Sequence, residues 1–339
     1  MLIHDLPTPA LVIDAGALEA NLATMAATHP GRSLRPHVKA HKCTSVARRQ
    51  TEHGHAAFTC ATPREAIGLA AAGIGDDLLV ANEVLDPRRL AALAAIDEAV
   101  TVTVAVDSIE TIHAAALAGV RSCLIDVDVG LPRCGCRPED AERLADEARR
   151  RGLDVRGVMG YEGHLMMVTD RAEQRGRVAA AMALLVRAHG AVGGTIVSAG
   201  GTGTYDLHDD TGITELQAGS YALMDDDYAQ LGLPFVQAVH VVGTVIAAHG
   251  PRRVADVGLK ALGMDHGDPS IDGATVWFCS DEHVTFAPDE RTAGAEHAVG
   301  GRVRVVPAHL DPTMAMHERA WLVRDDEVIE EWPIDLRGW

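Results

Sequence analysis

The stretch LRPHVKAHKC, residues 34–43, gathers side chains that could do chemistry, and it holds two of the three lysines in the chain. If the stretch is a β-strand, alternation places Lys39 on one face with Arg35 and two histidines, and Lys42 on the other. An inward amine beside cationic groups is expected to have a lowered pKa, as a nucleophilic lysine requires. We expect Lys42 at the surface. From this stretch alone, an ion-paired structural lysine explains Lys39 equally well.

Two glycine-rich stretches offer groups that could bind a phosphate, VSAGGTGT at residues 197–204 and QAGSY at residues 217–221. Backbone N–H groups and hydroxyls in such turns bind anions. The first stretch lacks the final lysine of a P-loop and is not a GxGxxG motif, so a nucleotide is poorly supported. A glycine-rich turn without a ligand is the alternative. The predicted phosphate-side residues are Ser198, Gly200, Gly201, Thr202, Gly203, Gln217, Gly219, Ser220 and Tyr221.

A nucleophilic lysine on an early strand and a phosphate site on late strands together match the needs of pyridoxal 5′-phosphate (PLP). The aldehyde of this cofactor requires an amine, and its phosphate requires an anion site. The sequence therefore predicts a PLP enzyme.

The elements that must position these groups follow a regular rhythm. Short β-type runs alternate with helical stretches about eight times. This alternation predicts an α/β fold with a (β/α)8 TIM barrel over residues 14–235, and an open doubly wound sheet is the alternative. Residues 236–339 contain β-rich segments without long helices, which predict an all-β C-terminal domain that the N-terminal strand, residues 1–13, could join.

Composition excludes some classes of function. A formal net charge of −18 argues against sequence-independent binding to nucleic acid or to an anionic membrane, which both require clustered Lys and Arg. The six cysteines are dispersed, without the dense spacing of a disulfide framework. The sequence also shows no pattern typical of a secretory leader and no long apolar run. We expect free thiols, a cytoplasmic location and no membrane span.

Several motifs together resemble one family: TPALVID, RPHVKAHK, DVDVGLPRCG, GYEGH, SAGGTGTYD, TELQAGSY and VPAHLDPT. The chain is similar to the D-threonine aldolase and D-serine dehydratase family of PLP enzymes, which are related to alanine racemase. The resemblance extends from residue 8 to about residue 317 and implies a PLP-binding barrel, a C-terminal β domain and a homodimer.

The resemblance also implies roles for individual residues. Lys39 matches the lysine that binds PLP covalently, and Arg133 matches the arginine that faces the pyridine nitrogen of PLP. Tyr161 and His164 of GYEGH match a pair on the substrate side. Without the resemblance, Arg133 reads as a surface residue and His164 as a structural histidine. A proline beside Arg133 departs from the family pattern and leaves its orientation open.

In this family, the position of His309 and Asp311 carries a metal ion. These two residues would share one face if their segment is extended. His-x-Asp is typical of the D-threonine aldolases, whereas His-x-Cys is typical of the zinc-dependent dehydratases. A carboxylate-rich site favours Mn²⁺ or Mg²⁺, and Zn²⁺ remains an alternative.

The sequence thus predicts a metal-activated aldolase that cleaves D-β-hydroxy-α-amino acids, such as D-threonine, to glycine and an aldehyde. The metal would acidify the substrate hydroxyl, and His164 or a metal-bound hydroxide would accept its proton. A D-serine or D-3-hydroxyaspartate dehydratase is the first alternative and an amino acid racemase the second. From a different class, the chain could be a non-catalytic PLP-binding protein, although a C-terminal β domain argues against that.

Overall fold

The computed structural model describes residues 1–289, 294 and 297–339. The chain divides into two compact units, each discontinuous in sequence. The first contains residues 1–24, 40–45 and 220–335, and the second contains residues 25–39, 46–219 and 336–339. The domain boundary predicted at residues 235 and 236 stays a prediction.

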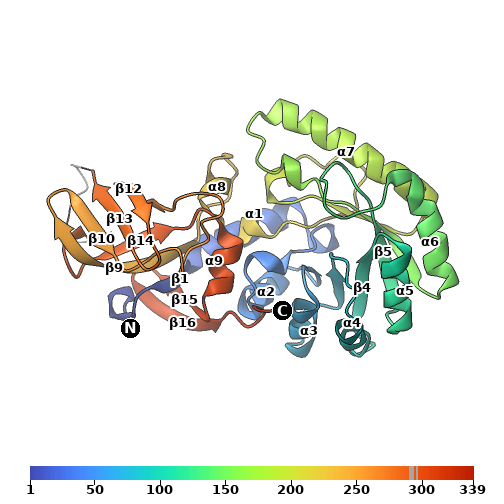
Figure 1. Ribbon diagram of the computed structural model, residues 1–339, viewed down its shortest axis with the longest axis horizontal. Helices are drawn as coiled ribbons and strands as arrows, with labels where there is room; N and C mark the ends of the chain where they lie inside the picture. Colours follow the sequence, from blue (N-terminus) through green and yellow to red (C-terminus); the bar gives the residue numbers. More distant parts are fainter. Residues whose placement is uncertain (290–293, 295–296) are drawn as a thin grey trace. The chain divides into compact units, whose positions relative to one another are not determined.

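The second unit is built on seven parallel strands that pair in chain order. They are β2 (Ala57–Cys60), β3 (Asp77–Val80), β4 (Thr101–Val106), β5 (Ser122–Asp126), β6 (Asp154–Met159), β7 (Ile196–Ala199) and β8 (Glu215–Leu216). The helices between them follow one another around the strands (Figure 1). They are α2 (Thr44–Glu52), α3 (Pro63–Ala71), α4 (Pro87–Ala94), α5 (Ile109–Leu117), α6 (Ala141–Arg150) and α7 (Arg171–Val192).

Residues 34–37 supply the eighth strand position and close the sheet. Leu34 forms a parallel bridge with Leu216 of β8, and His37 forms one with Thr59 of β2. Backbone hydrogen bonds run from Arg35 N–H to Leu216 O and from Thr59 N–H to Pro36 O, at 2.8 and 2.9 Å. The structure confirms the predicted barrel and excludes the open sheet.

Side chains alternate across the barrel wall as strand geometry requires. Outward residues such as Leu78, Val104 and Ile125 belong to the large apolar core under the helices. Inward residues form a smaller apolar layer inside the barrel, made of Leu79, Ala105, Leu124, Met159 and Ile196. The core is aliphatic, as a chain with 4% aromatic residues requires.

The first unit contains a nine-stranded sheet in the order β10-β13-β12-β11-β14-β9-β1-β15-β16. Its strands are β1 (Ala10–Asp14), β9 (Val239–His249), β10 (Arg252–Ala255), β11 (Ser270–Ile271), β12 (Ala274–Cys279), β13 (Val284–Pro288), β14 (Arg302–Val306), β15 (Arg319–Arg324) and β16 (Glu327–Pro333). Only the β1–β15 pair is parallel. The helices α1 (Ala15–Thr28), α8 (Asp226–Ala229) and α9 (Leu310–Met316) accompany this β-rich unit. Among the described residues, no helix has both the length and the apolarity needed to cross a bilayer.

Candidate active site

The predicted cofactor residues follow the carboxyl ends of successive barrel strands. Lys39 follows the closing segment 34–37, Arg133 follows β5, and Tyr161 and His164 follow β6. The turn of residues 200–204 follows β7, and Gln217 and Gly219 follow β8. Because the strands are parallel, their carboxyl ends lie at one end of the barrel, where enzymes of this architecture keep their active sites.

Lys39 lies in a single 3-10 turn, Val38–Ala40, rather than in a continuing strand. The ladder ends with the bond from His37 N–H to Ala218 O, and the N–H of Lys39 then donates to Nδ1 of His37 at 3.4 Å. Strand alternation therefore sets the inward direction of Arg35, but it does not set the direction of Lys39. Lys39 is half-buried.

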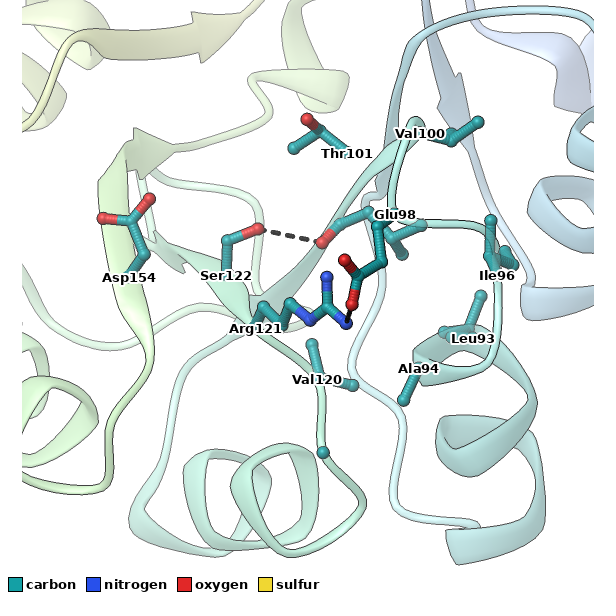
Figure 2. Close-up of a pocket in the computed structure, with 12 residues that line it drawn as sticks. Leu93, Ala94, Ile96, Glu98, Val100, Thr101, Val120, Arg121, Ser122 and Asp154 are labelled. Atoms are coloured by element: carbon teal, nitrogen blue, oxygen red, sulfur yellow. Dashed lines mark hydrogen bonds and ion pairs between the residues drawn. The ribbon is translucent and has the colours of Figure 1, made fainter.

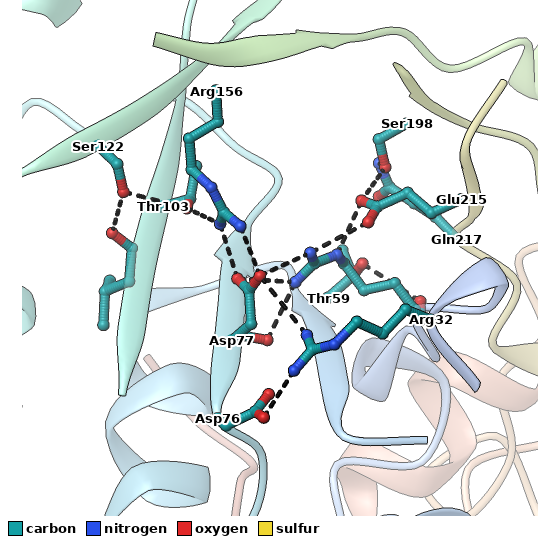
Figure 3. A network of polar contacts seen from close by, with 12 residues as sticks. Arg32, Thr59, Asp76, Asp77, Thr103, Ser122, Arg156, Ser198, Glu215 and Gln217 are labelled. Carbon is teal, nitrogen blue, oxygen red and sulfur yellow. Dashed lines mark hydrogen bonds and ion pairs between the residues drawn. The ribbon is translucent and has the colours of Figure 1, made fainter. Parts of the chain in front are cut away.

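Arg35 points inward, but its charge is used in a buried ion network at the N-terminal end of the strands (Figure 3). Its guanidinium lies 3.1 Å from Asp77 and 2.8 Å from Glu215, and Arg156 contacts Asp77 at 2.6 Å. Burial lowers the pKa of Arg35, but the Glu215 and Asp77 carboxylates outweigh burial and raise it. Burial raises the pKa of Asp77, but Arg156 and Arg35 outweigh that and lower it to about 2. These opposite charges therefore compensate one another within the network.

Two of the predicted phosphate-side residues extend this network. The Ser198 hydroxyl donates to Glu215 at 2.7 Å, and the Gln217 amide donates to Ser198 at 2.8 Å. Both side chains are buried inside the barrel.

Two pockets open beside the N-terminal ends of the strands. A pocket of about 200 Å³ lies between the end of α4 and the starts of β4 and β5, with the Arg121–Glu98 ion pair at its wall (Figure 2). A polar pocket of about 570 Å³ is lined by Arg32, Arg35 and Arg156 together with the carboxylates of Asp76, Asp77 and Glu215. None of the predicted site residues lines either pocket.

A buried carboxylate holds the glycine-rich turn in place. Glu162 accepts hydrogen bonds from the Gly200 N–H at 3.2 Å and the Thr204 hydroxyl at 2.8 Å, and its carboxylate lies 3.1 Å from Nε2 of His208. Burial raises the pKa of Glu162, but the His208 contact outweighs burial and lowers it. The position of Glu162 between Tyr161 and His164 was a signal that sequence reasoning missed.

The glycines of this turn allow close packing of backbone and side chains. A Cβ at Gly203 would lie 2.1 Å from the Met166 carbonyl oxygen, and one at Gly219 would lie 2.4 Å from the His37 carbonyl oxygen. Gly200 also has a φ of +84°, in the left-handed region. Close packing and backbone conformation therefore explain the glycines. The glycines alone are not evidence for a phosphate site, which has to be argued from hydrogen-bond donors near the turn.

Arg133 and Tyr161 lie together at the carboxyl end. The guanidinium carbon of Arg133 lies 5.5 Å from the centre of the Tyr161 ring, a cation–π distance. Arg133 is exposed and makes no ion pair with the residues that the structure describes. His164 is exposed beside Gly130, where a Cβ would lie 3.2 Å from its Cε1.

Two carboxylates and a thiol lie in the segments that follow three neighbouring strands, β3, β4 and β5, at the same end of the barrel. Glu83, Asp107 and Cys134 place potential ligand atoms within 4.8 Å of one another. The carboxyl of Asp126, at the end of β5, is buried, and burial, followed by the nearby Glu83, raises its pKa well above the usual range. The charge of Arg133 acts in the opposite direction. Acidic residues after consecutive strands were a readable signal in the sequence.

The donor set at the carboxyl end fits PLP. It provides a primary amine on Lys39, a guanidinium on Arg133 without an ion pair to any described residue, and a glycine-rich turn with a hydroxyl at Thr202. These are the groups that an aldehyde, a pyridine ring and a phosphate require.

His309 and Asp311 lie at the start of a helix and not in an extended segment. His309 is the N-cap residue of α9, and Asp311 lies in the first turn. The helix begins here because Asp225 accepts the Leu310 N–H at 2.9 Å. Nε2 of His309 lies 3.9 Å from Oδ2 of Asp311, so the pair remains close despite the change of conformation.

Two residues that the sequence did not identify, Asp265 and His266, contact His309. Asp265 Oδ2 lies 2.8 Å from Nδ1 of His309, and the His266 ring stacks on the His309 ring with centres 3.9 Å apart. Asp265, His266 and His309 place potential ligand atoms within 4.8 Å of one another. Burial raises the pKa of Asp265, but the hydrogen bond from His309 outweighs it and lowers that pKa. This mixed nitrogen and oxygen set fits a divalent metal ion.

Comparisons with known proteins agree with this geometry. The family model of the alanine racemase N-terminal domain matches residues 13–227, and a serine dehydratase domain model matches residues 238–323. The chain is 36% identical to a D-threonine aldolase from Arthrobacter sp., covering 98% of this chain and 93% of that protein.

Solved structures show the same likeness. The D-threonine aldolase from Filomicrobium marinum superposes with a TM-score of 0.93 at 32% identity, covering 99% and 97% of the two chains. The D-threo-3-hydroxyaspartate dehydratase from Delftia sp. HT23 has a TM-score of 0.87 at 25% identity, over the whole of both chains. Two further similar structures are variants of a D-threo-3-hydroxyaspartate dehydratase, one with a histidine replaced by alanine and one, metal-free, with a cysteine two positions later replaced by alanine. The chain therefore belongs to the alanine racemase-like family of PLP-dependent lyases that contains the D-threonine aldolases and the D-threo-3-hydroxyaspartate dehydratases.

Proposed function

We propose that this chain is a metal-activated aldolase that cleaves D-threonine-like β-hydroxy-α-amino acids to glycine and an aldehyde. The observation that carries the proposal is the carboxylate of Asp311, 3.9 Å from His309, with the carboxylate of Asp265 on the other edge of the imidazole. The similar D-threo-3-hydroxyaspartate dehydratase structures include variants at a histidine and at a cysteine two positions apart, and the cysteine variant is metal-free. A carboxylate in place of a thiolate favours a hard ion and supports the aldolase branch.

At the barrel, Lys39 would hold PLP through its amine, and Arg133 would face the pyridine ring with its guanidinium. Bound PLP would stabilise the electron pair left on Cα of the substrate when the Cα–Cβ bond breaks. The turn that Glu162 holds in place would bind the phosphate, with the Thr202 hydroxyl, backbone N–H groups and the later turn of Ser220 and Tyr221.

In this proposal His164 is the base. Nε2 of His164 would accept the proton of the substrate β-hydroxyl as the aldehyde forms, and Tyr161 would orient the substrate beside Arg133. A proton returned to Cα completes glycine. The net reaction splits D-threonine into glycine and acetaldehyde, with no oxidant or reductant.

His309 and Asp311 would hold the divalent ion, with Mn²⁺ as the first choice and Mg²⁺ or Zn²⁺ as alternatives. The ion would lower the pKa of the substrate hydroxyl and so favour loss of its proton.

A product assay tests the proposed reaction. Purified protein with PLP is incubated with D-threonine, D-serine and D-3-hydroxyaspartate, with and without EDTA. The proposal predicts glycine and aldehyde, and loss of activity with EDTA. Ammonia and a keto acid without glycine would instead establish the dehydratase, the second candidate, which the structural likeness to the Delftia enzyme favours. Cleavage that is insensitive to EDTA would contradict the metal assignment.

The proposed enzyme would act as a homodimer in the cytoplasm. Trp277 and Phe278 are about half exposed on neighbouring positions of β12, which supports an interface. Light scattering during size exclusion checks the predicted dimer mass.

A further inference from the structure

His309 has a defined neighbour on each ring edge and on one face. Nδ1 lies 2.8 Å from Oδ2 of Asp265, and Nε2 lies 3.9 Å from Oδ2 of Asp311. The His266 ring lies on one face of the imidazole with an interplanar angle of 6°. His266 is itself held through Nδ1 by Asp227 at 2.7 Å.

The segment that carries Asp265 is fixed against the start of α9. Gly263 forms an antiparallel bridge with His309, and its N–H donates to the Thr313 hydroxyl at 2.8 Å. That hydroxyl donates to the His309 carbonyl oxygen at 2.7 Å. A Cβ at Gly263 would lie 2.4 Å from Cγ of Pro312. The close approach therefore needs glycine, and it brings Asp265 to the imidazole from 44 residues away.

The chemistry of the contact decides which nitrogen carries the proton. An ionised carboxylate can only accept a hydrogen bond, so the 2.8 Å contact with Asp265 requires the N–H on Nδ1. In the neutral imidazole, Nε2 then keeps its lone pair, on the edge that faces Asp311. Nε2 of His309 and a carboxylate oxygen of Asp311, now 3.9 Å apart, would then be the atoms that hold the ion.

We propose that Asp265 is a positioning residue of the metal site: it fixes the Nδ1–H tautomer of His309 and so directs Nε2 toward an ion shared with Asp311. The inference rests on the proposed function, because it assumes that His309 and Asp311 are the ligands. The His266–Asp227 pair covers the face of the same imidazole and limits its rotation.

Direct titration with Mn²⁺ tests the role of Asp265. PLP-loaded protein is stripped with EDTA, desalted and titrated, and the paramagnetic resonance signal of free Mn²⁺ gives the dissociation constant. Removing a carboxylate that orients a metal-bound histidine weakens metal affinity by about 10- to 100-fold, which is the result expected for Asp265→Ala. Asp265→Asn keeps an oxygen that can accept the Nδ1–H, so its affinity should lie between wild type and Asp265→Ala. Asp268→Ala, an exposed carboxylate of the same segment, should bind as wild type does.

The His309→Ala variant separates the two levels of the proposal. If His309→Ala abolishes Mn²⁺ binding while Asp265→Ala binds as wild type, the positioning role fails and the proposed function stands. If Asp265→Ala loses binding as completely as His309→Ala, Asp265 is a ligand and the positioning role is overturned. If His309→Ala binds Mn²⁺ as wild type does, the metal assignment fails and the role of Asp265 fails with it. Unchanged PLP absorbance and melting temperature show that each variant is folded.

Discussion

At the N-terminal end of the barrel, Arg35 and Arg156 are paired with Asp77 and Glu215, whereas at the carboxyl end Arg133 makes no ion pair with the residues described and lies over the Tyr161 ring. Both ends contain cationic groups delivered by barrel strands. At the first end the charges are compensated within the protein. At the second end we propose that the guanidinium of Arg133 faces the cofactor.

The segment that closes the barrel, residues 34–37, carries Arg35 at the N-terminal end and leads to Lys39 at the carboxyl end. Arginine and lysine suit different roles at these two ends. Arg35 is a planar fork that binds two carboxylates and stays charged when buried, which suits a structural network. Lys39, four residues later, carries an amine whose pKa can shift and which can form a covalent bond. The comparison predicts that substitution of Lys39 lowers enzymatic activity, whereas substitution of Arg35 lowers the stability of the fold.

Lys39→Ala should have the largest effect. Without the amine, activity should fall by at least about 10³-fold, since the group that would hold the cofactor covalently is lost. The steady-state rate of aldehyde release measures this. Lys42→Ala is the matched control and should retain wild-type activity. A comparable loss in the Lys42 variant would show that the reactive amine is assigned to the wrong lysine.

Arg35→Leu should destabilise the protein by disrupting the ion network at the N-terminal end of the barrel. The substitution leaves Glu215 buried without its arginine and Asp77 without one of its two close arginines, which costs about 3–5 kcal/mol of unfolding free energy. Denaturant unfolding measures the loss. Arg32→Leu removes an exposed arginine that pairs with Asp76 and lies 3.8 Å from Asp77, and it should cost less than about 1 kcal/mol. Equal stability of the two variants would contradict a structural role for the buried network.

Glu162→Ala should affect the carboxyl end without touching a reacting group. It leaves the Gly200 N–H, the Thr204 hydroxyl and His208 without their acceptor, at a cost of about 1–3 kcal/mol. We expect faster release of PLP on dilution, followed by absorbance. Glu162→Gln keeps an acceptor oxygen and should release PLP more slowly than the alanine variant. Unchanged release from both variants would mean that this turn does not hold the cofactor.

The pH dependence of stability should show the smallest effect. The pKa of Asp77 is about 2 in the folded protein, below its unfolded value, so its contribution is present above about pH 4 and is lost as the pH falls toward 2. Asp77→Asn lacks this titration, so its unfolding free energy should fall less steeply between pH 4 and 2. Asp76→Asn, at the exposed neighbouring position, should follow the wild-type curve. Parallel curves for wild type and Asp77→Asn would argue against a charged Asp77 in the network.

The barrel was predictable because its strands alternate with helices in the sequence and because residues 34–37 alternate in polarity. Strand alternation correctly placed Arg35 inside, but its partners could not be foreseen. Asp77 and Glu215 come from distant strands that meet only when the barrel closes. The same closure carries Ser198 and Gln217 into that network.

The metal site shows a different limit. The sequence suggested an extended segment, whereas α9 begins at Leu310, directly after His309. Asp311 and Pro312 in the first turn were a readable helix-start signal. Asp265 gave no such signal, because its contact with His309 depends on the bridge at Gly263 and on packing against Pro312.

The most direct test is to identify the lysine that binds the cofactor. Borohydride reduction of the PLP-loaded protein fixes the cofactor on its lysine, and mass spectrometry of the peptides locates it. With only three lysines in the chain, the result is unambiguous. We predict label on Lys39, at the carboxyl end of the barrel. Label on Lys42 or Lys260 would contradict the assignment of the reactive end.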